Sequence, residues 1–151
     1  MRIIIKWSNG KVTNTHLLDV NAKEHAISQL KQKLGADIVE MLETEDNISF
    51  ENRKFRDAYD IKGGTVDICL DKAKEVVLNN IRAERAEKFV ELGIPFKLDS
   101  DLEAAILPAE KIEKLKELRD ITAPLKTDAV IPLETLEQVN INNITELLGD
   151  K

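Results

Sequence analysis

The chain has few aromatic residues, a single cysteine and no long apolar run. Aromatic residues make up 4% of the 151 residues, whereas 42% are hydrophobic and 33% are charged. A core must therefore rest mainly on Ile, Leu, Val and Ala, and high charge with few aromatics favours helices that are exposed on most of their faces. Cys69 has no second cysteine as a partner, which excludes an internal disulfide bond.

The chain also lacks a basic surplus and an apolar leader. Its formal net charge is −6 and its pI is about 5.1, so nucleic acid is an unlikely partner, because phosphate neutralisation supplies most of the affinity of such complexes. No apolar run reaches the ~18 residues that a membrane-spanning helix needs. Residues 1–6 do not resemble a signal peptide. We therefore expect a protein without a membrane partner that is made and kept in the cytoplasm.

Residues 2–18 predict a β-hairpin. Asn9-Gly10 is typical of a two-residue type I′ turn, which would place Trp7 opposite Val12. Alternation along the first strand puts a set of apolar side chains on one face. These are Ile3, Ile5 and Trp7. Because an isolated hairpin is marginal in water, this one must pack on a helix, find a third strand or pair with another subunit.

A helix is predicted over residues 21–34, with Asn21 as its N-cap, Glu24 completing a capping box and Gly35 in the left-handed position after its end. Residues 38–42 fit either a short helix or a strand. Residues 43–47 are polar and predict a loop. Gly63-Gly64 marks a turn, and the alternation that follows it predicts a short strand over residues 66–70.

The longest predicted helix covers residues 72–92, capped by Asp71 and ended by Gly93. A capping box at residues 100–103 opens a second helical segment up to residue 120, in which Pro108 either kinks the helix or occupies the first turn of a new one. The two segments predict an antiparallel helical hairpin. After it, short helices are expected around residues 133–139 and 143–149.

These elements predict an α+β protein in three parts. Residues 1–70 form a small α+β domain with an N-terminal hairpin and short helices. Residues 71–122 form an extended antiparallel helical hairpin, and residues 123–151 form an irregular C-terminal tail with short helices.

No catalytic, cofactor or metal site is indicated. The three soft ligands His16, His25 and Cys69 share no metal-ligand spacing, so a metal is not expected. Neither glycine pair belongs to a phosphate-binding or dinucleotide-binding loop. The many carboxylates are typical of a solvated acidic surface. The sequence therefore predicts a protein that is not an enzyme and has no cofactor.

The charged residues around Phe55 are the strongest candidates for a binding site. Arg53 and Arg56 flank this aromatic residue, and such a cluster either docks an acidic partner or clamps onto Asp57, Asp60 or a neighbouring helix. Arginines of the helical hairpin are weaker candidates: Arg82 and Arg85 lie on one helical face, where they can bridge to Glu103 or Glu110, and Arg119 suits the dipole at a helix end.

The order of several charged motifs resembles a family of small phage and prophage proteins of the head–tail morphogenesis region. The matching residues are Arg53, Phe55, Arg56, Ala58 and Tyr59; Gly63 and Gly64; Lys72, Ala73 and Lys74; Ile81, Arg82 and Arg85; and Leu118, Arg119, Asp120 and Thr122. The C-terminal half also resembles tail-fibre assembly proteins, in which an Arg-x-x-Arg helix precedes a Leu-Arg-Asp element. The resemblance covers roughly half of the chain.

This resemblance implies a non-enzymatic virion structural or assembly protein, found in the virion or in the host cytoplasm during assembly. Its partners would be other phage structural proteins, or copies of itself in an oligomer. The residues expected to bind them are Arg53, Phe55, Arg56, Tyr59, Arg82, Arg85 and Arg119. Two alternatives stay open: a transient tail or tail-fibre assembly chaperone, and a phage-encoded regulator or inhibitor of a host protein.

Overall fold

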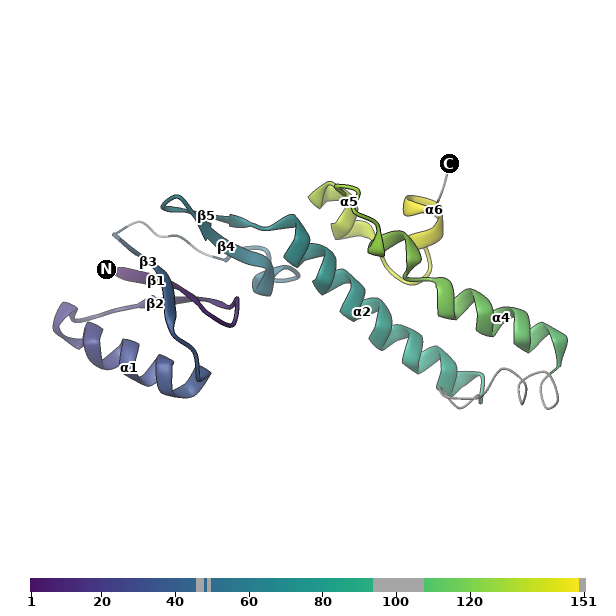
Figure 1. Cartoon of the computed structure of the whole chain (residues 1–151), viewed down its shortest axis with the longest axis horizontal. Coiled ribbons are helices and arrows are strands. Elements are labelled where there is room, and N and C mark those ends of the chain that lie inside the picture. The colour runs from purple at the N-terminus through teal and green to yellow at the C-terminus, as the bar shows by residue number, and fades with distance from the viewer. Residues whose placement is uncertain (46–47, 49, 94–107, 150–151) are drawn as a thin grey trace. The chain divides into compact units, whose positions relative to one another are not determined.

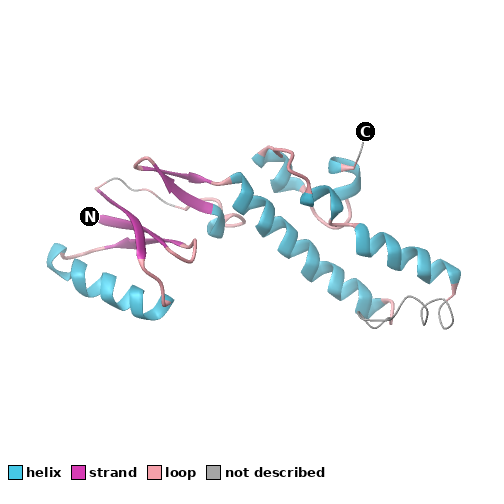
Figure 2. Cartoon of the chain, viewed as in Figure 1, coloured by secondary structure: helices cyan, strands magenta, loops and turns pink. Residues whose placement is uncertain are grey.

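The structure is a computed structural model that describes residues 1–45, 48, 50–93 and 108–149. It confirms the α+β class, with helices and two separate antiparallel sheets (Figures 1 and 2). The chain divides into two compact units, Met1–Ala73 and Lys74–Lys151. The strands all lie in the first unit, and the second is helical among its described residues (Figure 2). No helix in the described parts is both long and apolar enough to cross a membrane.

The first unit is built on a three-stranded antiparallel sheet. Its strands are β1 (Arg2–Trp7), β2 (Val12–His16) and β3 (Ile38–Thr44), in the order β2-β1-β3. The third strand that the predicted hairpin needs is β3, which includes residues 38–42, the segment for which a short helix and a strand were both predicted as alternatives. The expected loop begins later than predicted, because β3 continues to Thr44.

One face of this sheet carries the core of the unit. Helix α1 (Lys23–Leu34) lies along that face (Figure 1), and its left-handed end at Gly35 (φ 59°) is as predicted. The strand and loop side chains of this core are Ile3, Ile5, Trp7, Leu17 and Ala36, and those of α1 packed on them are Ala26, Ile27, Leu30 and Leu34. The predicted apolar face of β1 is confirmed, since its three side chains are at most 1% exposed.

Two local predictions in this unit are wrong. The hairpin loop has three residues, because Trp7 N donates to Lys11 O (2.9 Å) and Trp7 O accepts from Gly10 N (2.9 Å). Only Gly10 has a positive φ (81°), as in a type I turn followed by a glycine bulge, so Val12 pairs with Lys6. Asn21 is not the N-cap of α1, because it lies within the short 3₁₀ helix η1 (Val20–Ala22) that precedes α1. The Asp19 side chain caps η1 by accepting from Asn21 N (2.9 Å).

The opposite face of the sheet meets the segment after β3. This segment contains the 3₁₀ helix η2 (Arg56–Ala58) and the hairpin of β4 (Tyr59–Lys62) and β5 (Thr65–Ile68). The predicted turn at Gly63-Gly64 joins these strands, and both glycines have positive φ (59° and 80°). Arg2, Ile4 and Lys6 of β1 alternate with the core residues and so point toward this second layer.

The second unit is organised around two long helices. Helix α2 (Leu70–Glu91) contributes its first four residues to the first unit and the rest to the second, and α4 (Ala109–Asp120) runs beside it in the opposite direction (Figure 1). Lys111 Nζ donates to Leu92 O (3.3 Å) across the pair. Asp71 is not the cap of α2 but lies in its first turn, because the carbonyl of Cys69 already accepts from Ala73 N (2.9 Å).

The predicted second helical segment is described only from residue 108 onward. Pro108 is the N-cap of α4 (φ −59°, ψ 147°), so it lies one residue before the first turn in which one of the two predicted alternatives placed it. The capping box at residues 100–103 lies outside the described residues. Gly93 (φ 67°) follows α2 in the left-handed conformation, as predicted.

The C-terminal segment contains the 3₁₀ helix η3 (Ala123–Lys126) and the helices α5 (Leu133–Gln138) and α6 (Ile144–Leu148). It belongs to the same compact unit as α4. Its buried apolar side chains are Leu125, Ile131, Leu136, Val139, Ile141 and Ile144. Lys74 Nζ of α2 donates to the carbonyls of Thr127 (2.7 Å) and Ala129 (3.1 Å), and Ile141 N donates to Glu84 (3.2 Å). The tail thus supplies core to its unit.

Candidate partner-binding site

A hollow of about 510 Å³ lies on the second-layer side of the first unit. The described residues that line it are Arg2, Asn14, Phe50, Arg53 and Arg56. Three of these side chains are guanidinium groups and none is a carboxylate. The hollow therefore concentrates positive charge on a chain whose net charge is −6.

Strand register brings the first two of these residues together. Arg2 of β1 and Asn14 of β2 both lie on the face away from α1, and the Arg2 guanidinium donates to Asn14 Oδ1 (3.4 Å). The amide of Asn14 in turn donates to the backbone carbonyl of Ile48 (2.8 Å). Because Asn14 holds both a sheet residue and the following segment, it fixes one wall of the hollow.

Stacked aromatic rings form a second wall. The rings of Phe50 and Tyr59 are 4.3 Å apart between centroids and 8° from parallel. Asn52 N donates to the Tyr59 hydroxyl (3.2 Å), while the backbone carbonyl of Asn52 accepts from Phe55 N (3.2 Å). These contacts fold the chain between Phe50 and Tyr59 into a compact loop, from which Arg53 and Arg56 project.

Arg53 and Arg56 are exposed, and neither side chain forms an ion pair or hydrogen bond with another described residue. The internal clamp onto Asp57 or Asp60 is therefore not formed. Asp60 instead has two lysine partners, and Asp57 has no ion pair among the described residues. No side chain in the described part of the chain occupies the donors of these two arginines.

Phe55 has a different role from the one its sequence position indicated. Its side chain is 0% exposed, so it belongs to the core and does not line the hollow. The ammonium group of Lys54 lies 5.5 Å from the centre of its ring. The aromatic residue of the hollow is Phe50, which the sequence analysis did not single out. Tyr59 is half-buried and supports Phe50 from behind.

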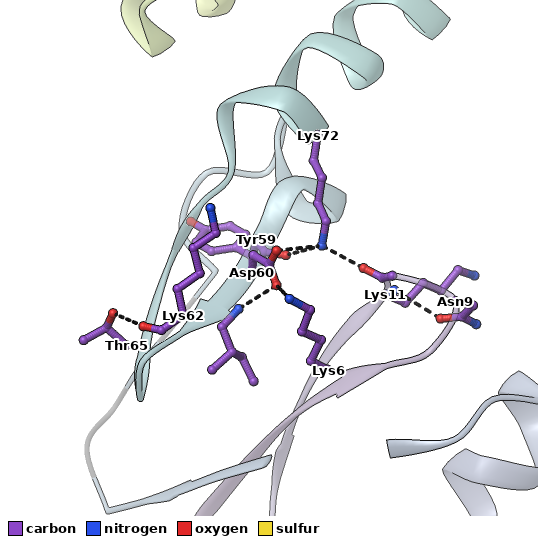
Figure 3. Close-up of polar contacts among 10 residues, drawn as sticks. Lys6, Asn9, Lys11, Tyr59, Asp60, Lys62, Thr65 and Lys72 are labelled. Atoms are coloured by element: carbon purple, nitrogen blue, oxygen red, sulfur yellow. Dashed lines mark hydrogen bonds and ion pairs between the residues drawn. The ribbon is translucent and has the colours of Figure 1, made fainter. Parts of the chain in front are cut away.

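A buried carboxylate fixes the second layer to the sheet (Figure 3). Asp60 is 7% exposed; its Oδ1 lies 2.8 Å from Lys6 Nζ and accepts from Ile61 N (2.9 Å), and its Oδ2 lies 3.5 Å from Lys72 Nζ. Lys72 also donates to the carbonyl of Gly10 (2.8 Å) in the hairpin loop. One carboxylate therefore joins β1, β4 and the first turn of α2.

Two pKa values are shifted by this arrangement. Burial acts to raise the pKa of Asp60, but the hydrogen bonds from Lys6 and from Ile61 N, together with the charges of Lys72 and Lys6, outweigh burial and lower it. The hydrogen bond to Asp60 raises the pKa of Lys6. Both shifts favour the charged forms, so Lys6 and Asp60 form an ion pair at neutral pH.

The other arginines expected to bind a partner lie in the second unit and do not line the hollow. Arg82 donates to Asn79 Oδ1 (3.2 Å) on the exposed side of α2. Arg85 donates to the backbone carbonyl of Arg119 (3.3 Å), which joins α2 to the end of α4. Glu110 forms no ion pair with them among the described residues, and Glu103 lies outside those residues. Arg85 thus has a structural contact within its own unit.

The described residues that line the hollow carry guanidinium, amide and aromatic groups, which suit recognition. No group of three His, Cys, Asp or Glu side chains in the described part of the chain could hold a metal ion. His25 contacts Gln29 (2.9 Å), and Cys69 is half-buried just before α2. Residues that the sequence analysis missed, Arg2, Asn14 and Phe50, carry no local motif, and only the fold brings them to Arg53 and Arg56.

No family model, no curated protein and no solved structure matches this chain.

Proposed function

We propose that this protein is a non-enzymatic phage structural or assembly protein that binds other phage proteins through the hollow of its first unit. The observation that carries the proposal is the pair of exposed guanidinium groups, Arg53 and Arg56, which none of the described carboxylates neutralises. Six cationic groups form ion pairs within the described part of the chain, and Arg53 and Arg56 are not among them.

The chemistry of the hollow suits binding. A guanidinium group presents a planar set of donors that matches a carboxylate with two parallel hydrogen bonds. Arginine and aromatic side chains are also the residues that most often dominate the energy of protein–protein interfaces. Phe50 and the arginines supply both types within one concave surface.

The phage setting rests on the resemblance of the charged motifs in residues 53–122. Arg53, Arg56 and Tyr59 belong to those motifs and also to the hollow or its wall, which supports a binding role for that segment. A virion component and a transient assembly chaperone both need such a surface. They differ in whether the protein stays in the finished particle.

The test is deletion of the coding sequence from the phage or prophage that carries it. We expect infectious particles to be lost and to return when the wild-type protein is supplied from a plasmid, but not when the Arg53→Ala/Arg56→Ala variant is supplied. Mass spectrometry of purified particles then separates a stoichiometric virion part from a chaperone that is present only in lysates. Normal particle yield without the protein would refute both forms of the proposal.

A matched control keeps the experiment specific. Lys33 and Lys126 are exposed lysines, in α1 and η3, so Lys33→Ala/Lys126→Ala removes the same total charge at other places. We expect this variant to restore particle formation. Failure of the control as well would attribute the loss to net charge and would contradict a role for the hollow.

A further inference from the structure

We infer that the hollow lined by Arg2, Asn14, Phe50, Arg53 and Arg56 accepts an extended acidic peptide segment in which carboxylates flank one apolar side chain. This inference deepens the proposed function, on which it rests, by naming the chemical class of the partner.

The charge of the hollow selects an anion. Three guanidinium groups line it together with one amide and one aromatic ring, and no described carboxylate does so. Arg53 and Arg56 have no partner among the described residues, so no described group satisfies their donors. A ligand carboxylate can accept charge-assisted hydrogen bonds from them, which are about twice as strong as neutral ones.

The walls of the hollow are already fixed. Asn14 links Arg2 to the Ile48 carbonyl, and Phe50 is stacked on Tyr59, whose hydroxyl is held by Asn52 N. These contacts lower the entropy cost of ordering Asn14 and Phe50 on binding, whereas Arg53 and Arg56, which contact no described side chain, gain order when a ligand binds. Phe50 lines the hollow together with the three arginines, so we match an apolar side chain of the ligand to Phe50 and carboxylates to the arginines.

The rest of the chain argues against a long polyanion. Nucleic-acid affinity grows with the number of phosphates that are neutralised, and this hollow offers only three described cations. Beyond the hollow, a net charge of −6 repels a polymer of phosphates. A short segment places its few negative charges within the hollow, and only its immediate neighbours meet the acidic surface.

The experiment measures binding of fluorescent peptides to the full chain by anisotropy at about 0.1 M salt, where the Debye length is about 10 Å. The probe has the core Glu-Asp-Phe-Glu-Asp between Gly-Ser ends. One comparison peptide carries Gln and Asn in place of the acids, another carries Gly in place of Phe, and a thymidine oligonucleotide of matched length tests phosphate. We expect the acidic peptide to bind more than tenfold tighter than any of the three.

Protein variants assign the binding to the hollow. Arg53→Ala/Arg56→Ala should weaken the acidic peptide more than tenfold, and Arg53→Lys/Arg56→Lys should also weaken it, because lysine keeps the charge but loses the planar pair of donors. The Lys33→Ala/Lys126→Ala control should bind as the wild type does. Unchanged far-UV circular dichroism shows that each variant is folded.

The possible results separate this inference from the proposed function. If the acidic peptide binds no better than its amide counterpart, or if the oligonucleotide binds tighter, the inference is wrong. The proposed function still stands in that case if Arg53→Ala/Arg56→Ala stops particle formation. If the peptide binds through the hollow but normal particles form without the protein, the proposed function is wrong and the inference stands.

Discussion

Replacing Asp60 by Asn should destabilise the first unit by about 2 kcal/mol. The carboxylate is 7% exposed and accepts from Lys6 at 2.8 Å, with Lys72 at 3.5 Å. Hydrogen bonds to charged groups contribute about 1.5–3 kcal/mol each, and breaking a fully buried ion pair costs about 3–5 kcal/mol. In the Asp60→Asn variant both lysine side chains, which are a quarter exposed, recover part of their hydration. The expected loss of stability therefore lies in the lower of the two ranges, at about 2 kcal/mol.

The chain offers a direct assay and a matched control. Trp7 is the only tryptophan, lies in the core of the first unit and is 1% exposed, so its fluorescence reports the unfolding of that unit in urea. With an m-value of about 1–2 kcal/mol per M, a loss of 2 kcal/mol moves the midpoint by roughly 1–2 M. Asp37→Asn removes a carboxylate that also accepts from a lysine, Lys31 at 2.6 Å, but whose side chain is 77% exposed. This control should leave the urea midpoint close to that of the wild type, because exposed ion pairs contribute little to stability.

The effect should depend on pH with a defined sign. The pKa of Asp60 is lowered below its ordinary value of 3.8, so its contribution is present above that value and is lost as the pH falls through the lowered pKa. The pKa of Lys6 is raised above 10.5, so its contribution is present below that value and is lost as the pH rises through the raised pKa. The difference between wild type and Asp60→Asn should therefore stay constant between these limits and shrink in acid.

Two results would refute this reasoning. One is an Asp60→Asn midpoint equal to that of Asp37→Asn at neutral pH. The other is a stability difference that stays the same when the pH is lowered well below 3.8, because a protonated Asp60 and an asparagine should then be nearly equivalent.

Three further predictions concern the core, a turn and the surface. Ile81 in α2 is 1% exposed, so Ile81→Ala should lower the free energy of unfolding by about 2–5 kcal/mol, as measured by far-UV circular dichroism melts. Asn80→Ala, at the exposed neighbouring position, should not lower it. Gly64 has a φ of 80°, so Gly64→Ala should lower the free energy of unfolding by about 1–2 kcal/mol, as followed by Trp fluorescence. An unchanged unfolding midpoint would contradict the left-handed conformation of this turn. Arg53→Ala/Arg56→Ala should stay within about 0.5 kcal/mol of wild type in the same assay, whereas a large loss would reveal an internal clamp.

The sequence predicted the fold where a local rule decides the outcome. Alternation of Ile3, Ile5 and Trp7 identified the core face of β1, and Gly35 marked the end of α1. Asn9-Gly10 is compatible with two kinds of hairpin loop, and the choice depends on contacts outside the hairpin. Ser8 N donates to Asp37 O (2.8 Å), so the loop is held by the start of the third strand.

Only the lining residues that are close together in the sequence, Arg53 and Arg56, could be predicted. Arg53 and Arg56 could be found because they stand close together in a charged, aromatic segment. Arg2 and Asn14 join them through strand pairing, a long-range contact that leaves no spacing signal in the sequence. Phe50 and Phe55 are chemically identical neighbours of the arginines, and only the folded loop decides which one is buried.

The position of the C-terminal core residues has a consequence for protein synthesis. The first unit ends at Ala73, whereas the second unit, to which most of α2 belongs, has buried side chains as late as Ile144. At ~5–20 residues per second, roughly 3–10 s pass between translation of Glu91 and of Ile144. During that interval the buried side chains Val77, Leu78 and Ile81 lack part of the core of their unit, so we expect a chain paused before Ile144 to be recognised by chaperones.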